Sequence, residues 1–190
     1  MEAFLVSAGL VAIAEIGDKT MLLAVLLAAT WRRPVPILLG IFIATLLNHA
    51  LAAGLGALLG SSLQGQWVKW VLGLGFLGFA AWALIPDKLE DDEGRPDPGD
   101  KTAWGVFAAT AVAFFLVEMG DKTQVATAAL GARFPAAVAF VAAGTTIGMM
   151  IANTPAVLIG EAAATKLPLK YIRWAAAAGF AATGVWVLLS

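Results

Sequence analysis

Two copies of one charged hexapeptide interrupt apolar stretches of this chain. Residues 15–20 read EIGDKT and residues 118–123 read EMGDKT, so each copy supplies a glutamate, an aspartate, a lysine and a threonine. Carboxylate and hydroxyl oxygens are the ligands that hard cations such as Mg²⁺, Ca²⁺ and Mn²⁺ prefer. The two acids of a copy are three residues apart, which places them on one face of a continuous helix. Each copy therefore predicts a pair of carboxylates that can share an ion.

The glycine inside each copy allows two backbone arrangements. It permits another backbone to approach closely, or it breaks the helix and frees carbonyl groups for coordination. Across both copies, four carboxylates and two ammonium groups add up to a formal charge of −2, which a divalent cation would neutralise. The candidate metal ligands are Glu15, Asp18, Glu118 and Asp121, with Thr20 and Thr123 as further oxygen donors.

Apolar residues dominate the rest of the sequence. The chain has 190 residues, of which 61% are hydrophobic and 13% are charged, and its mean hydropathy is +0.86. Soluble domains have roughly 45–50% apolar and about 25% charged residues, so a bilayer is the expected environment. The formal net charge of −1 gives no sign of a nucleic-acid partner. The lack of cysteine and the single histidine argue against thiolate sites and a histidine-rich zinc site.

Charged side chains inside membrane spans are costly when they face lipid. Each costs roughly 2.5–3.5 kcal/mol at a helix centre, so the six motif charges would cost on the order of 15–20 kcal/mol. A whole domain is stable by only about 5–15 kcal/mol. The motif groups must therefore face one another, water or an ion.

Long apolar segments are the elements that must position the two motifs. Six of them reach roughly the 20 residues that a helix needs to cross the hydrocarbon core: residues 3–29, 34–60, 66–86, 103–130, 135–160 and 168–189. An acidic linker at 87–102 separates two halves, 1–86 and 103–190. The predicted fold class is an all-α polytopic membrane protein with six transmembrane helices.

The two halves resemble each other in sequence. An offset of 103 superposes the two hexapeptides, and an offset of 104 superposes residues 70–82 on 174–186, where both Trp residues and a Gly-Phe pair match. Because each half has three spans, an odd number, the second half enters the bilayer from the opposite face. The pattern predicts two inverted three-helix repeats, with a site near the midplane where the halves meet.

Basic residues predict the orientation. One side of the predicted bundle carries Arg32, Arg33, Lys88, Arg95, Lys101, Lys166, Lys170 and Arg173, and the other carries Lys69 and Arg133. Lys and Arg concentrate in cytoplasmic loops. We therefore expect the acidic linker to be cytoplasmic and both termini to be outside.

Three further polar residues are candidates for a supporting role. His49 is opposite Asn153 at the offset of 104, and Asn48 is its neighbour. A lone histidine on an apolar helix is often a packing residue, so both interpretations stay open. Lys19 and Lys122 also have two interpretations, because each follows the glutamate of its own motif by four residues, the favoured order for a helical salt bridge. The motifs could tune an ion site, or they could be neutral pairs that lock the bundle as a structural scaffold.

An intramembrane aspartyl protease is an alternative from another class. Asp18 and Asp121 could form a dyad that shares one proton. The two glutamates and two lysines have no obvious place in such a dyad, and the symmetry of the halves suits alternating access better. A transporter is therefore the preferred interpretation.

The doubled motif resembles that of a known family, the Golgi calcium/manganese transporters of eukaryotes and their bacterial manganese-exporter relatives. That family is marked by two copies of E-x-G-D-[KR]-[ST], and this chain carries both in full, over essentially all six predicted helices. The resemblance implies transport of Mn²⁺ or Ca²⁺, with the motif acids as the ion site and protons as the exchanged ion.

The lack of an N-terminal extension and the short linker resemble the bacterial members. We therefore expect a secondary transporter in a bacterial plasma membrane that exports Mn²⁺ and has no permanently bound cofactor. A Ca²⁺/H⁺ antiporter of the same architecture is the alternative, and a homodimer is possible. Export of a dication against about 100 mV costs about 4.6 kcal/mol, so a passive pore would run inward and coupling to protons is favoured.

Overall fold

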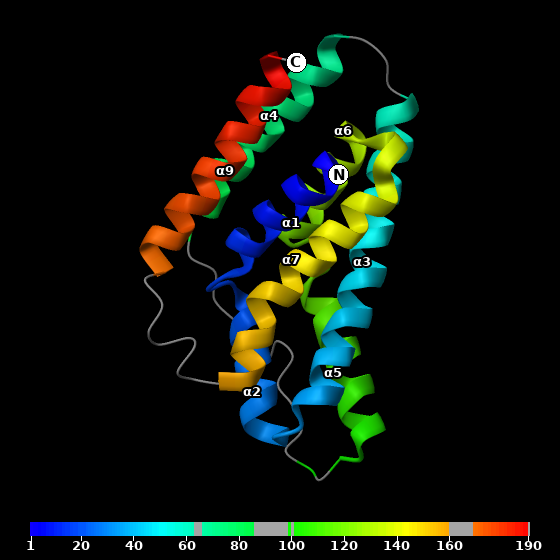
Figure 1. Cartoon of the computed structure of the whole chain (residues 1–190), viewed down its shortest axis with the longest axis vertical. Coiled ribbons are helices and arrows are strands. Elements are labelled where there is room, and N and C mark those ends of the chain that lie inside the picture. The colour runs from blue at the N-terminus through cyan, green and yellow to red at the C-terminus, as the bar shows by residue number, and fades with distance from the viewer. Residues whose placement is uncertain (63–65, 86–98, 100, 160–168, 190) are drawn as a thin grey trace.

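The computed structural model describes residues 1–62, 66–85, 99, 101–159 and 169–189, and all regular structure within them is helical (Figure 1). The helices are α1 (Glu2–Glu15), α2 (Lys19–Trp31), α3 (Pro34–Ser62), α4 (Gln66–Ala83), α5 (Ala103–Val117), α6 (Lys122–Arg133), the short 3-10 helix η1 (Pro135–Ala137), α7 (Val138–Ile159) and α9 (Leu169–Leu189). Most of the predicted linker at 87–102 lies outside the described residues.

Both motifs lie at breaks between two helices. α1 ends at Glu15 and α2 begins at Lys19, while α5 ends at Val117 and α6 begins at Lys122; α6 is turned by 73° relative to α5. Gly17 and Gly120 have φ angles of 84° and 78°, a left-handed conformation that glycine adopts without steric cost. Of the two arrangements open to the glycine, the structure shows the break. The prediction that each pair of acids shares one face of a continuous helix is wrong for this reason.

Several helices are long and apolar enough to cross a bilayer. By length and composition, three described segments meet this test, Pro34–Ser62, Pro135–Ile159 and Lys170–Leu189, and the bent pair of α5 and α6 makes a fourth if it is one span. The chain is therefore an all-helical membrane protein, and the count of six spans stays a prediction.

Helix α3 shows why the bundle needs a lipid environment. Its outer face exposes a run of large apolar side chains at helical spacing, Leu39, Ile43, Leu47, Leu51, Leu55 and Leu58. Its inner face buries Thr45, Asn48 and His49. Polar groups inside and leucines outside are the distribution expected of a helix in hydrocarbon rather than in water.

Small residues bring the two halves together at equivalent positions. A Cβ on Gly40 of α3 would lie 2.7 Å from the Thr110 Cβ of α5, and one on Gly144 of α7 would lie 3.0 Å from the Ser7 Cβ of α1. Gly144 follows Gly40 by 104 residues and Thr110 follows Ser7 by 103. Close packing through small residues is typical of helices in membranes, and here the same contact is made twice.

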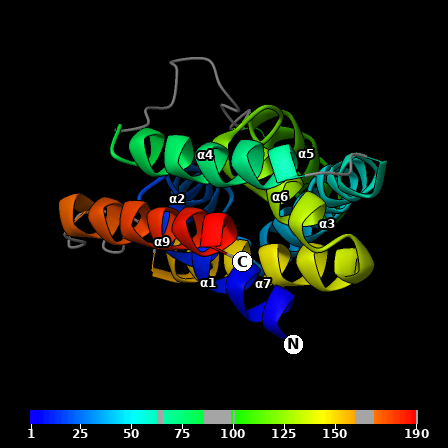
Figure 2. The same cartoon turned by 90° about the horizontal axis from the view of Figure 1, so that it is seen from above.

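Helices α4 and α9 pack on each other and rest against the rest of the bundle through α6 and α1 (Figure 2). Figure 1 shows the breaks between α1 and α2 and between α5 and α6 at about the same level of the molecule. The fold therefore holds the two motifs next to each other, beside the pair formed by α4 and α9.

Candidate metal centre

Each motif aspartate begins the second helix of its broken span. The Asp18 carboxylate accepts a hydrogen bond from the Lys19 amide at 2.7 Å, and the Asp121 carboxylate accepts one from the Thr123 amide at 3.2 Å. Aspartate is a preferred residue at this position because it satisfies amides that have no partner within the helix. The break thus fixes each aspartate at a helix N-terminus.

Carboxylates from both halves converge at one buried point. Glu15, Glu118 and Asp121 each offer an oxygen that lies within 4.8 Å of the other two. The two glutamates are fully buried, and Asp121 and Asp18 are almost so. Three acids at this spacing, from two helix breaks a hundred residues apart in sequence, can bind one cation together.

The motif lysines pair across the two halves. The Lys19 Nζ lies 3.5 Å from the Asp121 Oδ1, and the Lys122 Nζ lies 3.6 Å from the Asp18 Oδ2. Helical spacing made salt bridges within each motif possible, whereas these two pairs cross from one motif to the other. The break at the glycine removes the helical register between each glutamate and its lysine, and the aspartate of the other motif is in reach instead.

The motif threonines orient the glutamates. The Thr20 hydroxyl donates to the Glu15 Oε2 at 2.6 Å, and the Thr123 hydroxyl is 3.3 Å from the Glu118 Oε2 and 3.2 Å from the Asp121 Oδ2. Both threonines are buried. Each hydroxyl therefore holds one carboxylate oxygen, while its own lone pairs can still face a cation.

His49 reaches the site and Asn153 has contacts on its own helix. The His49 Nε2 lies 3.9 Å from the Glu118 Oε2, with both side chains fully buried. The Asn153 Nδ2 donates to the Met149 carbonyl at 3.1 Å and contacts the Met149 sulfur at 2.9 Å. The structure thus brings the histidine to a motif acid, whereas the hydrogen bonds that Asn153 makes to described residues stay within α7.

Several buried polar atoms of these residues have no hydrogen-bond partner in the part of the chain that the structure describes. They are Glu15 Oε1, Asp18 Oδ2, Glu118 Oε1, Asn153 Oδ1 and both ring nitrogens of His49. Buried polar atoms are nearly always paired. A cation bound among these residues would give several of these atoms a partner.

Sequence reasoning missed the residues that follow each motif. The Gly120 amide donates to the Gln124 Oε1 at 2.6 Å, and the Gly17 amide donates to the Met21 sulfur at 3.3 Å. Asn48, a predicted supporting residue, contacts Gln124 and the Phe115 carbonyl. The offset of 103 that aligns the motifs also aligns Met21 with Gln124. The sequence repeat could therefore have drawn attention to both residues.

A small cavity borders the first break. It lies between that break and the helices α4 and α9, and its lining includes Gly17, Asp18, Ala83, Lys122 and Arg173. The cavity holds only about 10 Å³, so it is a small void beside Asp18 and Lys122. Arg173 is a cation next to it that the sequence did not single out for the site.

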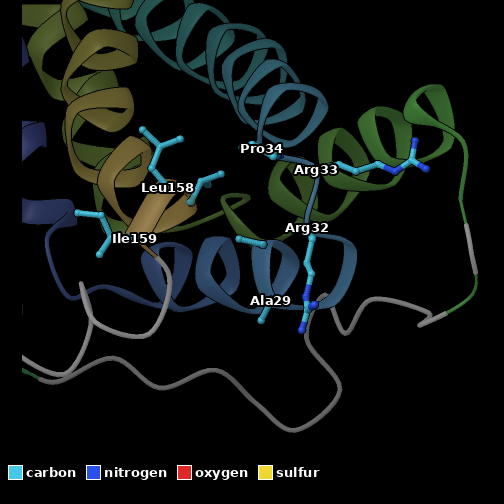
Figure 3. Close-up of a pocket in the computed structure, with 8 residues that line it drawn as sticks. Ala29, Arg32, Arg33, Pro34, Leu158 and Ile159 are labelled. Atoms are coloured by element: carbon cyan, nitrogen blue, oxygen red, sulfur yellow. The ribbon is translucent and has the colours of Figure 1, made fainter.

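A second pocket lies at the turn between α2 and α3, next to the end of α7 (Figure 3). Arg32, Arg33, Leu158 and Ile159 are among its lining residues. The two arginine side chains extend in different directions in Figure 3, so they do not form a common anion site. None of the motif acids lines this pocket.

Acids that converge from two broken helices inside an apolar bundle define a membrane protein that handles cations. The chain belongs to the family described as divalent cation/proton antiporter GDT1, whose profile matches residues 3–91 and 106–190. The family consists of transporters, so this chain is a transporter and not an enzyme. The protease alternative is not favoured.

Individual relatives agree with this assignment. A Vibrio cholerae serotype O1 protein named "Putative manganese exporter" is 50% identical over 173 residues, which are 91% of this chain and 84% of that protein. GDT1-like protein 4 of Oryza sativa subsp. indica is 28% identical over 188 residues, which cover 87% of this chain and 66% of the rice protein. GDT1-like protein 3 of the same subspecies is 27% identical over 188 residues. No solved structure matches this chain.

Proposed function

We propose that this chain is a secondary transporter that exports Mn²⁺ in exchange for protons. The observation that carries the proposal is the convergence of Glu15, Glu118 and Asp121 from the two motifs at one buried point. The family assignment and the name of the Vibrio relative support it. Ca²⁺ is the alternative substrate within the same architecture.

The proposed ligands are the four motif acids, Glu15, Asp18, Glu118 and Asp121. Together with Lys19 and Lys122 they carry a formal charge of −2, which one dication balances. Oxygen-rich sites suit both Mn²⁺ and Ca²⁺, but imidazole is a ligand for transition metals rather than for Ca²⁺. The position of His49 near Glu118 therefore favours Mn²⁺. Thr20, Thr123, Asn48 and Asn153 have supporting roles in this proposal.

The proposed architecture is six spans in two inverted repeats, residues 1–86 and 103–190, joined by a cytoplasmic linker at 87–102. The paired glycine breaks, the reciprocal lysine–aspartate pairs and the repeated Gly40 and Gly144 contacts all support a two-fold relation. In the proposed orientation both termini are outside, in a bacterial plasma membrane.

The coupling step is a competition for the same carboxylates. In the structure the lysines supply the counter-charges of Asp18 and Asp121. A dication that binds all four acids competes with those lysines, and protons that neutralise the acids compete with the dication. Mn²⁺ and protons then exclude each other at one site, which is what exchange requires.

Manganese tolerance of cells tests this function. Cells that lack their own exporter and express this chain should survive higher external Mn²⁺ than cells without it. Asp18→Asn should remove the protection at equal protein level, because a proposed ligand loses its charge. Glu2→Gln, at the exposed start of α1, is the control. Protection that Asp18→Asn leaves intact would contradict the proposed site.

A further inference from the structure

The two helix breaks differ in how they are held, although their motifs are nearly identical. At the second break the Gln124 side chain accepts from the Gly120 amide at 2.6 Å and donates to the Asn48 side-chain oxygen. At the first break the equivalent of Gln124 is Met21, which accepts from the Gly17 amide but has no hydrogen to donate. The equivalent of Asn48 is Ala152, which has no polar side chain.

Asn48 extends the connection to α5. Its Nδ2 donates to the Phe115 carbonyl at 3.4 Å. In an unbroken helix that carbonyl would accept from the amide of Met119, but here the Met119 amide bonds to the Leu116 carbonyl. Asn48 therefore serves a carbonyl that the end of the helix leaves without its usual partner.

The connection lies next to the ion site. Asn48 is 1% exposed and precedes His49, whose ring faces Glu118. Because His49 is on α3 and Glu118 is at the second break, a connection that holds α3 to this break also holds the His49 ring near Glu118.

We propose that Asn48 and Gln124 form a tether that holds the second break on α3 and positions Glu118 and Asp121 for the cation. At the first break the described residues show no such tether, because Met21 and Ala152 stand at the equivalent positions, and this break borders the small cavity next to Asp18. The half that carries Glu118 and Asp121 is thus the tethered half of the site, and the half that carries Glu15 and Asp18 lacks this particular connection. The inference rests on the proposed transport function for its effect on Mn²⁺, and its geometry stands apart from that function.

The chain supplies its own test variants. Gln124→Met and Asn48→Ala each introduce the residue found at the equivalent position of the other half. We therefore expect both variants to fold. Each should raise the KM for Mn²⁺ about ten-fold in proteoliposomes and leave the maximal rate and the protein yield nearly unchanged. The double variant should be no worse than either single one, since both act through one connection. Glu2→Gln, at the exposed start of α1 in the other half, is the control and should leave the KM unchanged.

Hydrogen–deuterium exchange tests the tether without transport. Asn48 bonds to Gln124 and to the Phe115 carbonyl but not to the Gly120 amide, so faster exchange in residues 118–124 of Asn48→Ala would report the loss of these contacts with the second break. We expect both single variants to speed exchange there and to leave residues 15–21 unchanged. Unchanged exchange in 118–124, or effects on KM that multiply in the double variant, would overturn the tether. If the wild-type protein did not transport Mn²⁺, the proposed function would be overturned. The hydrogen–deuterium exchange measurement would still decide whether the tether exists.

Discussion

The ammonium group of Lys19 lies 3.5 Å from the carboxylate of Asp121, which belongs to the other motif. The reciprocal pair of Lys122 and Asp18 has nearly the same distance, 3.6 Å. Each half therefore supplies the counter-charge of the other half's aspartate. The two motifs depend on each other even before a cation binds.

Loss of Lys19 should make stability depend on Mn²⁺. Lys19→Met leaves Asp121 buried beside two glutamates without its counter-charge, and breaking a buried pair in this way costs about 3–5 kcal/mol. A bound dication restores the balance. We expect a lower Tm than wild type without metal and a larger rise in Tm on adding Mn²⁺. Lys170→Met, at an exposed position of α9, is the matched control, and an equal Mn²⁺ shift in all three proteins would count against the cross-pairing role.

The glutamates should be required for transport in equal measure. Glu15→Gln and Glu118→Gln keep the shape and the hydrogen bonds from Thr20 and Thr123 but remove one negative charge from the site. Mn²⁺ uptake into proteoliposomes should fall by about a hundred-fold in each, which corresponds to about 2.7 kcal/mol. If one of the two variants transports like wild type, the site does not use both motifs.

The break at the second motif should require glycine because of the positive φ angle of Gly120 and not because of crowding around it. A Cβ on Gly120 meets no atom within 4 Å, so a substitution there tests only the φ of +78°. Gly120→Ala should cost about 1 kcal/mol or more and should slow transport strongly. Gly78→Ala also meets no atom within 4 Å, but it lies within helix α4 and should be neutral or slightly stabilising. Equal behaviour of the two variants, measured by Tm and uptake, would show that the break is not needed.

The imidazole should set the preference between Mn²⁺ and Ca²⁺. His49→Asn copies Asn153, the residue at the equivalent position of α7, and replaces a nitrogen ligand by an amide. We expect Ca²⁺ to compete better against Mn²⁺ in the variant than in wild type, because amide oxygen suits Ca²⁺ and imidazole does not. An unchanged competition curve would mean that His49 is a packing residue.

The sequence predicted which residues meet, and it did so from the repeat. All four motif acids were expected at one point, because charged groups in apolar spans must face one another, water or an ion. Glu15, Glu118 and Asp121 do offer oxygens within 4.8 Å of one another, and Asp18 is not in that group. Their local geometry was predicted wrongly. Helical spacing put Glu15 and Lys19 on one face, but Gly17 breaks the helix and sends the lysine to Asp121. Whether a glycine breaks a helix depends on the tertiary contacts around it, and these cannot be derived from residue spacing alone.

The role of Asn48 could not be read from the sequence for a related reason. Its partner Gln124 is 76 residues away, and the pairing depends on how α3 packs against α6. A polar residue next to His49 looked like a ligand. The hydrogen bonds that the described residues give it go instead to the Gln124 side chain and the Phe115 carbonyl.

The central claim is that one site exchanges Mn²⁺ for protons, and flux against a pH gradient measures it directly. Purified protein in liposomes is given external Mn²⁺, with an internal pH indicator, and the lumen is acidic or at the external pH. The account predicts that an acidic lumen speeds Mn²⁺ uptake, that uptake raises the internal pH, and that both effects vanish in Glu118→Gln. Mn²⁺ flux that is the same with and without the pH gradient would contradict it.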